Sequence, residues 1–124
     1  MNGNTGRSPL ARPSDMPGLA RPIIDGYSLE VSARSIPALA AVAPRMAPSS
    51  TMFIPNLPGE DDDARLSAAA AVRGLGFEPM LHVPARRIAS HAELESFVTR
   101  AVAEAGTERC FVIAGDSSRP KGPF

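Results

Sequence analysis

Four polar side chains lie at or just past the ends of short apolar runs, and their types suit acid–base chemistry and ligand recognition. They are Glu30, Asn56, His82 and Asp116. Glu30 alternates with Leu29 and Val31, so its side chain points away from theirs along an extended segment. If that side faces the interior of a closed sheet, desolvation raises the carboxyl pKa, as a general acid near neutral pH requires. The alternative is a surface glutamate on a strand edge.

The other candidates also carry two interpretations each. Asp116 follows Ala114 and Gly115, where the glycine lets the backbone approach a ligand closely and the ionised aspartate can oppose a cationic group. Gly-Asp is also a common turn pair. His82 could hydrogen-bond a cofactor or titrate, but a lone histidine in an apolar strand is more often a core residue. We expect the single cysteine, Cys110, to be a buried strand residue rather than a reactive thiol.

Strands and helices alternate in the part of the chain that carries these residues. Strands are expected over residues 27–31, 51–55, 77–83 and 109–115, and helices over residues 35–46, 59–76 and 90–106. Pro55 ends the second strand because it has no N–H to donate. The fourth strand is apolar without alternation, as expected for a parallel strand that is covered on both faces.

The helices have recognisable ends and apolar faces. Ser90 and Glu93 form a capping box, and Gly106 ends that helix after one apolar stripe: Leu94, Phe97, Val98, Ala101, Val102 and Ala105. The first helix is expected to have Ser35 as its cap, Pro37 in its first turn, and an inward face made of Leu39, Val42, Ala43 and Met46. The acidic run at residues 60–63 suits the positive end of a helix dipole, which we favour over a metal site.

This order, β-α-β-α-β-α-β, predicts an α/β fold with a parallel sheet and right-handed crossovers. Neither a G-x-G-x-x-G after the first strand nor a P-loop motif occurs, so a dinucleotide-binding fold of the usual type and a P-loop fold are not supported. A TIM-type (β/α)8 barrel fits better, but it needs about 250 residues. We therefore predict a partial barrel of about four parallel strands with three helices over residues 27–124.

Composition limits the partners and the compartment. Thirteen basic side chains balance thirteen acidic ones, so nothing in the totals suggests a nucleic-acid or anionic-membrane surface. Residues 1–26 mix Gly, Pro, Asn, Ser and Arg without a sustained period, which predicts a flexible leader. We find no apolar stretch long enough to span a bilayer and no signal-peptide core, so we expect a cytoplasmic protein with no membrane partner.

Four ordered segments, "YSLEVSAR", "FIPNLPGED", "GFEPMLHVPARRIASHAEL" and "FVIAGDSSRPKGPF", resemble the N-terminal half of methylenetetrahydrofolate reductases, in a divergent branch of that family. The resemblance runs from about residue 27 to the end. It implies a barrel in which FAD takes hydride from NADH or NADPH and passes it to 5,10-methylenetetrahydrofolate, giving 5-methyltetrahydrofolate.

The resemblance also implies roles for the candidate residues. Glu30 matches the proposed acid that opens the folate's imidazolidine ring, and Asp116 matches an aspartate near folate and flavin that stabilises the resulting cation. His82 matches a histidine beside the flavin. Ala114 and Gly115 belong to the same cofactor-binding segment as Asp116, and Asn56 is expected to contact the substrate.

Several positions depart from the family's pattern. A threonine that usually contacts the flavin is Pro55 here, an arginine that commonly precedes Gly-Asp is Ala114, and a phenylalanine-proline stretch after the glutamate is replaced by residues 31–34. These changes weaken the expected flavin contacts. Because the later barrel strands are not among these residues, we expect the chain to be inactive alone and to need a homo-oligomeric partner or the missing C-terminal half.

Two other functions stay open. One is a non-catalytic α/β binding or assembly module in which Glu30 and Asp116 are ordinary polar residues. The other is a folate methyl-transfer enzyme that keeps the barrel but does not use flavin.

Overall fold

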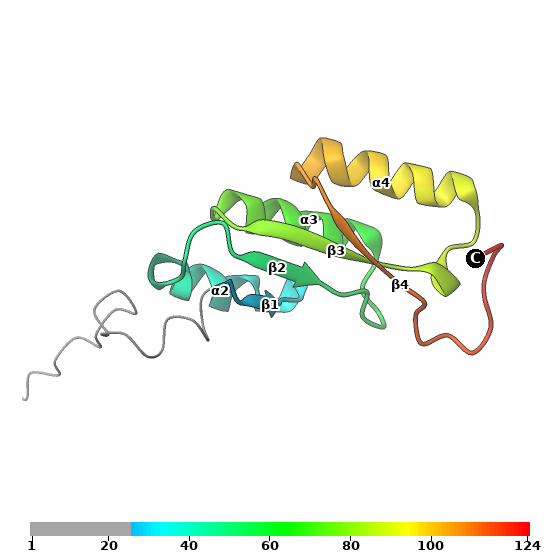
Figure 1. Ribbon diagram of the computed structural model, residues 1–124, viewed down its shortest axis with the longest axis horizontal. Helices are drawn as coiled ribbons and strands as arrows, with labels where there is room; N and C mark the ends of the chain where they lie inside the picture. The colour runs from blue at the N-terminus through cyan, green and yellow to red at the C-terminus, as the bar shows by residue number, and fades with distance from the viewer. Residues whose placement is uncertain (1–25) are drawn as a thin grey trace, which may run out of the picture.

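A computed structural model describes residues 26–124, and these residues form one parallel β-sheet with helices packed against it (Figure 1). The strands are β1 (Ser28–Glu30), β2 (Thr51–Ile54), β3 (Glu78–Pro84) and β4 (Cys110–Ile113). Their order in the sheet is β1-β2-β3-β4, and every neighbouring pair is parallel. The α/β class and the four parallel strands are therefore confirmed.

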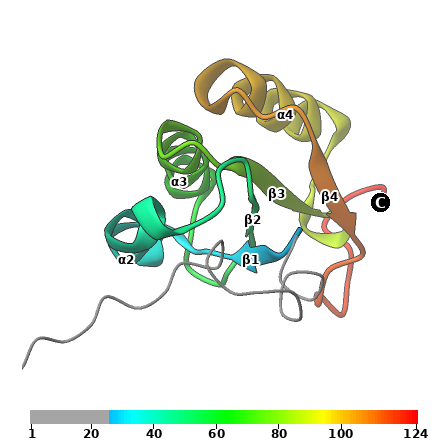
Figure 2. The same cartoon turned by 60° about the vertical axis from the view of Figure 1, so that its left-hand side comes forward.

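Three α-helices connect the strands within the described residues. They are α2 (Ile36–Val42), α3 (Asp62–Gly74) and α4 (His91–Ala105), and short 3-10 turns η2 (Ala33–Ser35), η3 (Ala43–Arg45) and η4 (Ala85–Arg87) adjoin them. The three α-helices lie on one face of the curved sheet, and the opposite face carries none (Figure 2). Each helix crosses back from the end of one strand to the start of the next strand along the sheet.

Helix α4 begins after Ser90 and ends at Gly106 as its sequence predicts, but only half of the predicted capping box forms, because the Glu93 carboxylate bonds the amide of Ala89 and not that of Ser90. The Ser90 hydroxyl accepts a 3.1 Å hydrogen bond from the Glu93 amide, and the Glu93 carboxylate accepts one of 2.9 Å from the amide of Ala89. Gly106 ends the helix in the left-handed conformation, at a φ of 57°, where a residue without a Cβ is least strained. These contacts satisfy amide groups that a helix end leaves unpaired.

The other two helices begin differently. Asp61 caps α3, since its carboxylate accepts a 2.8 Å hydrogen bond from the Ala64 amide. Ser35 is the residue before α2, as predicted, but its hydroxyl makes no cap bond to that helix. The Ser35 hydroxyl instead contacts Ser32, one turn earlier in the chain: it accepts a 2.8 Å hydrogen bond from the Ser32 amide and donates one of 2.9 Å to the Ser32 carbonyl. This pair of serines fixes the 3-10 turn that turns the chain from β1 into α2.

The core lies between the sheet and the helices. Alternate strand residues supply one side of it, Met52, Ile54, Leu81 and Val83, and the facing helices supply Leu39, Leu66, Ala69, Val72, Phe97, Ala101 and Ala105. All of these are buried. Because successive strand residues point to opposite faces, the residues between them belong to the helix-free face.

Three expectations about burial were wrong, and all concern the ends of the sheet. Cys110 is exposed, and β4 is exposed along most of its length instead of being covered on both faces. The reason is that β4 is an edge strand, with helices on one side only. Val98 and Val102 of α4 (41% and 57% exposed) and Val42 of α2 (46% exposed) lie at the edges of the apolar faces to which we assigned them, while the rest of each face packs inward.

Two further expectations concern the predicted N-terminal leader and membrane-spanning segments. The predicted leader, residues 1–26, falls almost entirely outside the residues that the structure describes. Among residues 26–124, no helix has both the length and the apolar character needed to cross a bilayer.

Candidate functional site

The four candidate residues lie at one edge of the sheet, where the parallel strands end. Glu30 is the last residue of β1, His82 lies near the end of β3, and Asn56 and Asp116 follow β2 and β4. Strands that run parallel bring their carboxyl ends to the same edge, and in α/β sheets this edge is where ligands usually bind.

Aromatic side chains cover part of the helix-free face of the sheet beside this edge, and we call them the aromatic surface. The rings of Phe53, His82 and Phe111 contact one another, with centroids 5.3–5.7 Å apart. The register explains this, because Glu30 lies level with Phe53 on the neighbouring strand, and His82 lies level with Phe111. Glu30 therefore shares its face with the aromatic rings, while Leu29 and Val31 point toward the helices, as the alternation predicts.

Glu30 is exposed among the described residues, so the desolvation expected inside a closed sheet stays a prediction. No helix and no further strand among residues 26–124 covers its face of the sheet. Desolvation of Glu30 would require a covering element.

His82 is half-buried among these aromatic rings, and desolvation lowers its pKa below the usual range. The charge of Glu30 opposes that shift, and the buried guanidinium of Arg65 adds to it. The imidazole is therefore neutral at neutral pH, and it presents a flat polarizable ring rather than a cation. The core interpretation of this histidine is wrong, because His82 lies outside the buried core, and its role beside a cofactor stays a prediction.

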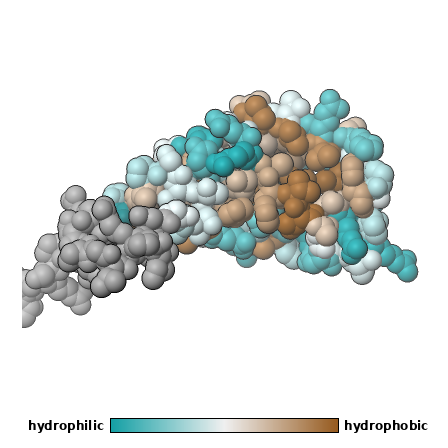
Figure 3. Space-filling model, viewed as in Figure 1, coloured by the Kyte–Doolittle hydropathy of each residue, from teal (hydrophilic) through white to brown (hydrophobic). Residues whose placement is uncertain are grey.

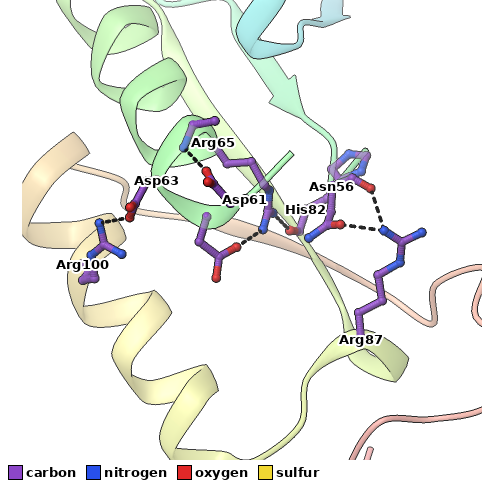
Figure 4. A network of polar contacts seen from close by, with 9 residues as sticks. Asn56, Asp61, Asp63, Arg65, His82, Arg87 and Arg100 are labelled. Carbon is purple, nitrogen blue, oxygen red and sulfur yellow. Dashed lines mark hydrogen bonds and ion pairs between the residues drawn. The ribbon is translucent and has the colours of Figure 1, made fainter. Parts of the chain in front are cut away.

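Arg87 joins two of the candidate residues, and Figure 4 shows its contact with one of them, Asn56. Its Nη1 donates a 2.8 Å hydrogen bond to Asn56 Oδ1, and its Nη2 donates one of 2.7 Å to Asp116 Oδ1. The hydrogen bond and charge of Arg87 hold the pKa of Asp116 below its usual range. Asp116 is thus held in its ionised form by a cation of the chain itself, and its expected role opposite a cationic group of a ligand stays a prediction. Its side chain is 76% exposed, so the pair is open to solvent and to an incoming ligand.

Arg65 lies beneath this edge and is 2% exposed. It donates to the backbone carbonyl of His82 and to Asp62 Oδ1, the latter at 2.9 Å, and its guanidinium lies 4.8 Å from the centre of the Phe97 ring. Burial lowers the pKa of Arg65, against the opposing effect of Asp62. This buried arginine ties the start of α3 to the end of β3, and so positions the strand that carries His82.

A pocket opens between these arginines and the first turns of α3 and α4. Arg65, Arg87, His82, Asn56 and Glu93 supply its polar lining, with Leu94 and Phe97 on the apolar side. Its volume of about 40 Å³ has room for a water molecule or two and not for a cofactor ring. A large ligand at this edge would have to lie on the helix-free aromatic surface instead.

Ala114 and Gly115 form the turn between β4 and Asp116. The Ala114 carbonyl accepts a 3.0 Å hydrogen bond from the Arg86 amide, which joins this turn to the segment after β3. Gly115 has a φ of 89°, and a Cβ there would lie 3.1 Å from Pro84 Cβ. Glycine is therefore required by the backbone turn and by the close approach to Pro84, in addition to any role near a ligand.

The structure brings the candidates together in two groups. Glu30 and His82 share the aromatic face, and Asn56 and Asp116 are joined through Arg87. No hydrogen bond connects the two groups among the described residues. Neither arginine was expected from the sequence. Arg87 had a signal, because Arg86 and Arg87 come shortly after the third strand, but Arg65 lies inside a helix pattern where its burial has no sequence signature.

No protein-family model matches the sequence. The chemistry of this site therefore has to be argued from its own residues. They offer an exposed carboxylate beside an aromatic surface, and an ionised aspartate held by an arginine on the neighbouring segment.

Proposed function

We propose that residues 27–124 form part of a TIM-type (β/α)8 barrel from an oxidoreductase similar to methylenetetrahydrofolate reductase. The single observation that carries this proposal is the placement of Glu30, His82 and Asp116 at the carboxyl edge of a parallel sheet whose strand order follows the chain. These are the three positions for which the family resemblance implies functional roles.

The topology supports a barrel over the other common parallel folds. In a doubly wound sheet the strand order reverses at a switch point, and helices cover both faces. Here the order β1-β2-β3-β4 follows the chain without reversal, and the helices lie on one face (Figure 2). A barrel has this arrangement, with helices outside and a helix-free inner face. Closure to eight strands requires four more than residues 26–124 contain.

The residues at the edge suit the proposed roles. Glu30 would donate a proton to the folate nitrogen whose bond to the methylene carbon breaks, once other strands cover its face and desolvate it. Asp116, kept ionised by Arg87, would stabilise positive charge that develops on the folate. Asn56 would fix the orientation of the substrate by hydrogen bonding.

The aromatic surface fits a flat ring system. The rings of Phe53, His82 and Phe111 are partly exposed and lie beside Glu30, so a flavin could pack on them. FAD, when bound, would supply hydride transfer, with NADH or NADPH as the hydride source. The turn of Ala114 and Gly115 would adjoin the cofactor. Residues 26–124 contain no closed pocket of this size, so we expect the isolated chain to be inactive.

The proposal is tested by ligand binding, which does not require turnover. FAD fluorescence and calorimetry with 5-methyltetrahydrofolate would be followed for the full chain and for Phe111→Ala, Glu30→Gln and Asp116→Asn. We expect Phe111→Ala to weaken FAD binding, and the two carboxylate variants to weaken folate binding. Glu95→Gln, on the exposed side of α4, is the matched control. Binding of neither compound, or binding that these variants leave unchanged, would overturn the proposal.

One observation favours a second function on the same barrel. Pro55 is buried at the end of β2, and its side chain has no hydroxyl to offer a flavin. A folate methyl-transfer enzyme without flavin would accept this residue. Folate binding without any FAD binding would support that alternative, and a folded chain that binds neither would favour a non-catalytic binding or assembly module.

A further inference from the structure

Exposed apolar side chains gather at the two ends of the sheet. At one end, which we call the β4 surface, Val112 of β4 is 66% exposed, and Val98 and Val102 of α4, which line a shallow pocket together with Cys110 of β4, are also exposed. Figure 3 shows hydrophobic surface over β4 and the neighbouring part of α4. At the other end, the β1 surface, Leu29 of β1 and Val42 of α2 are 43% and 46% exposed. Each surface thus combines an edge strand with the helix beside it.

Both edge strands also lack a partner on one side. β1 pairs only with β2, and β4 pairs only with β3, within the described residues. An unpaired parallel edge with apolar side chains tends to add another strand. The strand that would extend the sheet beyond β4 must be parallel to it and followed by a helix on the same face.

We propose that a second copy of this chain supplies that strand, so that β4 of each copy pairs with β1 of the other around a twofold axis. Two such contacts join eight parallel strands and leave no open edge, which makes the assembly a closed dimer. This inference rests on the barrel topology in the proposed function, and it adds the occupant of the open edges and the register of the contact.

The register follows from the geometry of the barrel. An eight-stranded barrel of this type has a shear of about eight residues, so each identical half contributes about four. In the observed register, Ser28 of β1 is level with Thr51 of β2 and with Glu78 of β3. A stagger of four residues moves the position along β3 from Glu78 to His82, and His82 is level with Phe111 of β4. The closed dimer therefore places Ser28 of one copy level with Phe111 of the other.

The side-chain directions agree with this register. Ser28 and Phe111 both belong to the helix-free face, because Ser28 lies level with Thr51 and Phe111 with His82. The next pair, Leu29 and Val112, then lies on the helix side of both strands. A shift by one residue would turn every side chain to the wrong face. In this register Leu29, the exposed strand residue of the β1 surface, covers Val112, the exposed strand residue of the β4 surface.

The charges beside the two surfaces are complementary. Residues 31–59, which include α2, contain Arg34 and Arg45 and no acidic residue. Helix α4 contains Glu93, Glu95 and Glu104 against a single arginine. Neither Arg34 nor Arg45 forms an ion pair within the part of the chain that the structure describes. In the closed dimer α2 of one copy lies beside α4 of the other, so the arginines of the turns that flank α2, Arg34 in η2 and Arg45 in η3, come near an acidic helix.

A disulfide between copies tests the register directly. In a Cys110→Ser background, Leu29→Cys and Val112→Cys are combined in one chain and the protein is oxidised. Neighbouring strands lie about 4.8 Å apart, within the range that a disulfide spans. We expect a covalent dimer on a non-reducing gel. The matched control replaces Leu29→Cys with Ser28→Cys, whose side chain points to the opposite face, and should stay uncrosslinked.

Sedimentation of the unmodified chain over micromolar concentrations tests the assembly itself. We expect a dimer, and we expect Val112→Glu and Leu29→Glu each to raise its dissociation constant on the order of a hundredfold, because each change falls in both contacts. Circular dichroism would confirm that both variants remain folded. A monomer at all concentrations, an open series of larger oligomers, or crosslinking of the control pair would overturn the proposal.

The result is separable from the proposed function. A dimer that binds neither FAD nor 5-methyltetrahydrofolate would keep the interface and overturn the proposed function. A monomer that binds both would overturn the interface and keep the function, with the edges then covered by other strands.

Discussion

Arg87 Nη2 donates a 2.7 Å hydrogen bond to Asp116 Oδ1, and this contact links the segment after β3 to the segment after β4. The same guanidinium bonds Asn56, which follows β2. One side chain therefore holds the ends of three strands at the edge where the candidate residues lie. The guanidinium thus reaches Asp116 from the segment that follows the neighbouring strand.

The first prediction concerns the protonation of Asp116. Because the hydrogen bond and charge of Arg87 lower the Asp116 pKa, the stabilisation that this pair contributes is present above the ordinary aspartate pKa and is lost as the pH falls through the lowered value. Arg87→Gln should return the Asp116 pKa toward its ordinary value. NMR titration of the side-chain carboxyl measures it. Arg86→Gln is the control, since Arg86 contacts the Ser117 carbonyl and not Asp116, and an equal shift in that variant would contradict the assignment.

A second prediction concerns His82. Desolvation lowers its pKa, so the folded protein disfavours the imidazolium, and His82 should reduce stability as the pH falls below the pKa of an unfolded histidine. Glu30→Gln removes a charge that favours the imidazolium and should lower the His82 pKa further. Glu95→Gln should leave it unchanged. The titration is read from the imidazole proton shifts, and an unchanged or raised His82 pKa in Glu30→Gln would show that the charge of Glu30 does not act on the imidazole.

Among the charged residues, we expect substitution of Arg65 to lower the stability of the fold the most. Arg65→Met leaves the carbonyl of His82 without its buried donor and removes the contact with the Phe97 ring. We expect the free energy of unfolding to fall by about 2–3 kcal/mol. Arg65→Lys should recover little, because an ammonium cannot bond two acceptors with the planar fork of a guanidinium. Urea denaturation measures both. Arg100→Met, at an exposed ion pair with Asp63 and Glu104, is the control and should have a much smaller effect.

The local signals in the sequence predicted the elements well. Ser90, Glu93 and Gly106 set the ends of α4 within a residue, because capping depends on a few neighbouring atoms. The alternation of Leu29, Glu30 and Val31 gave the correct face for Glu30. Pro55 ended β2 as expected, with the strand finishing at Ile54. These outcomes depend only on groups that are close in sequence.

The failures involve contacts between distant segments. The apolar run of β4 resembles a strand buried on both faces, yet Val112 and Cys110 are exposed because burial depends on which elements flank a strand in the sheet. Arg87 meets Asn56 and Asp116 across 31 and 29 residues of sequence. No local period marks such a contact. The sequence could therefore place the candidate residues at one edge, but it could not identify the arginine that joins two of them.

The final prediction concerns the segment that follows β4. Residues 114–124 pack along the η4 turn, where the Lys121 amide donates a 2.9 Å hydrogen bond to the Arg86 carbonyl and the Phe124 ring lies 4.8 Å from that of His91. Gly122 makes this packing feasible, since a Cβ there would overlap the carbonyl oxygen of Ala89. Gly122→Ala should therefore displace the segment and loosen the turn that carries Arg87.

Hydrogen exchange at the Lys121 amide measures that displacement, and we expect faster exchange in Gly122→Ala. The matched control is Gly74→Ala at the end of α3, where a Cβ meets open space. That variant should keep the Lys121 amide protected, and it should stabilise the fold by up to about 0.5–1 kcal/mol, because alanine loses less backbone entropy than glycine in a helix. Unchanged exchange at Lys121 in Gly122→Ala would show that the segment is not held against Ala89. A change confined to Gly122→Ala, accompanied by a rise in the Asp116 pKa, would show that the packed segment also keeps Arg87 on the aspartate.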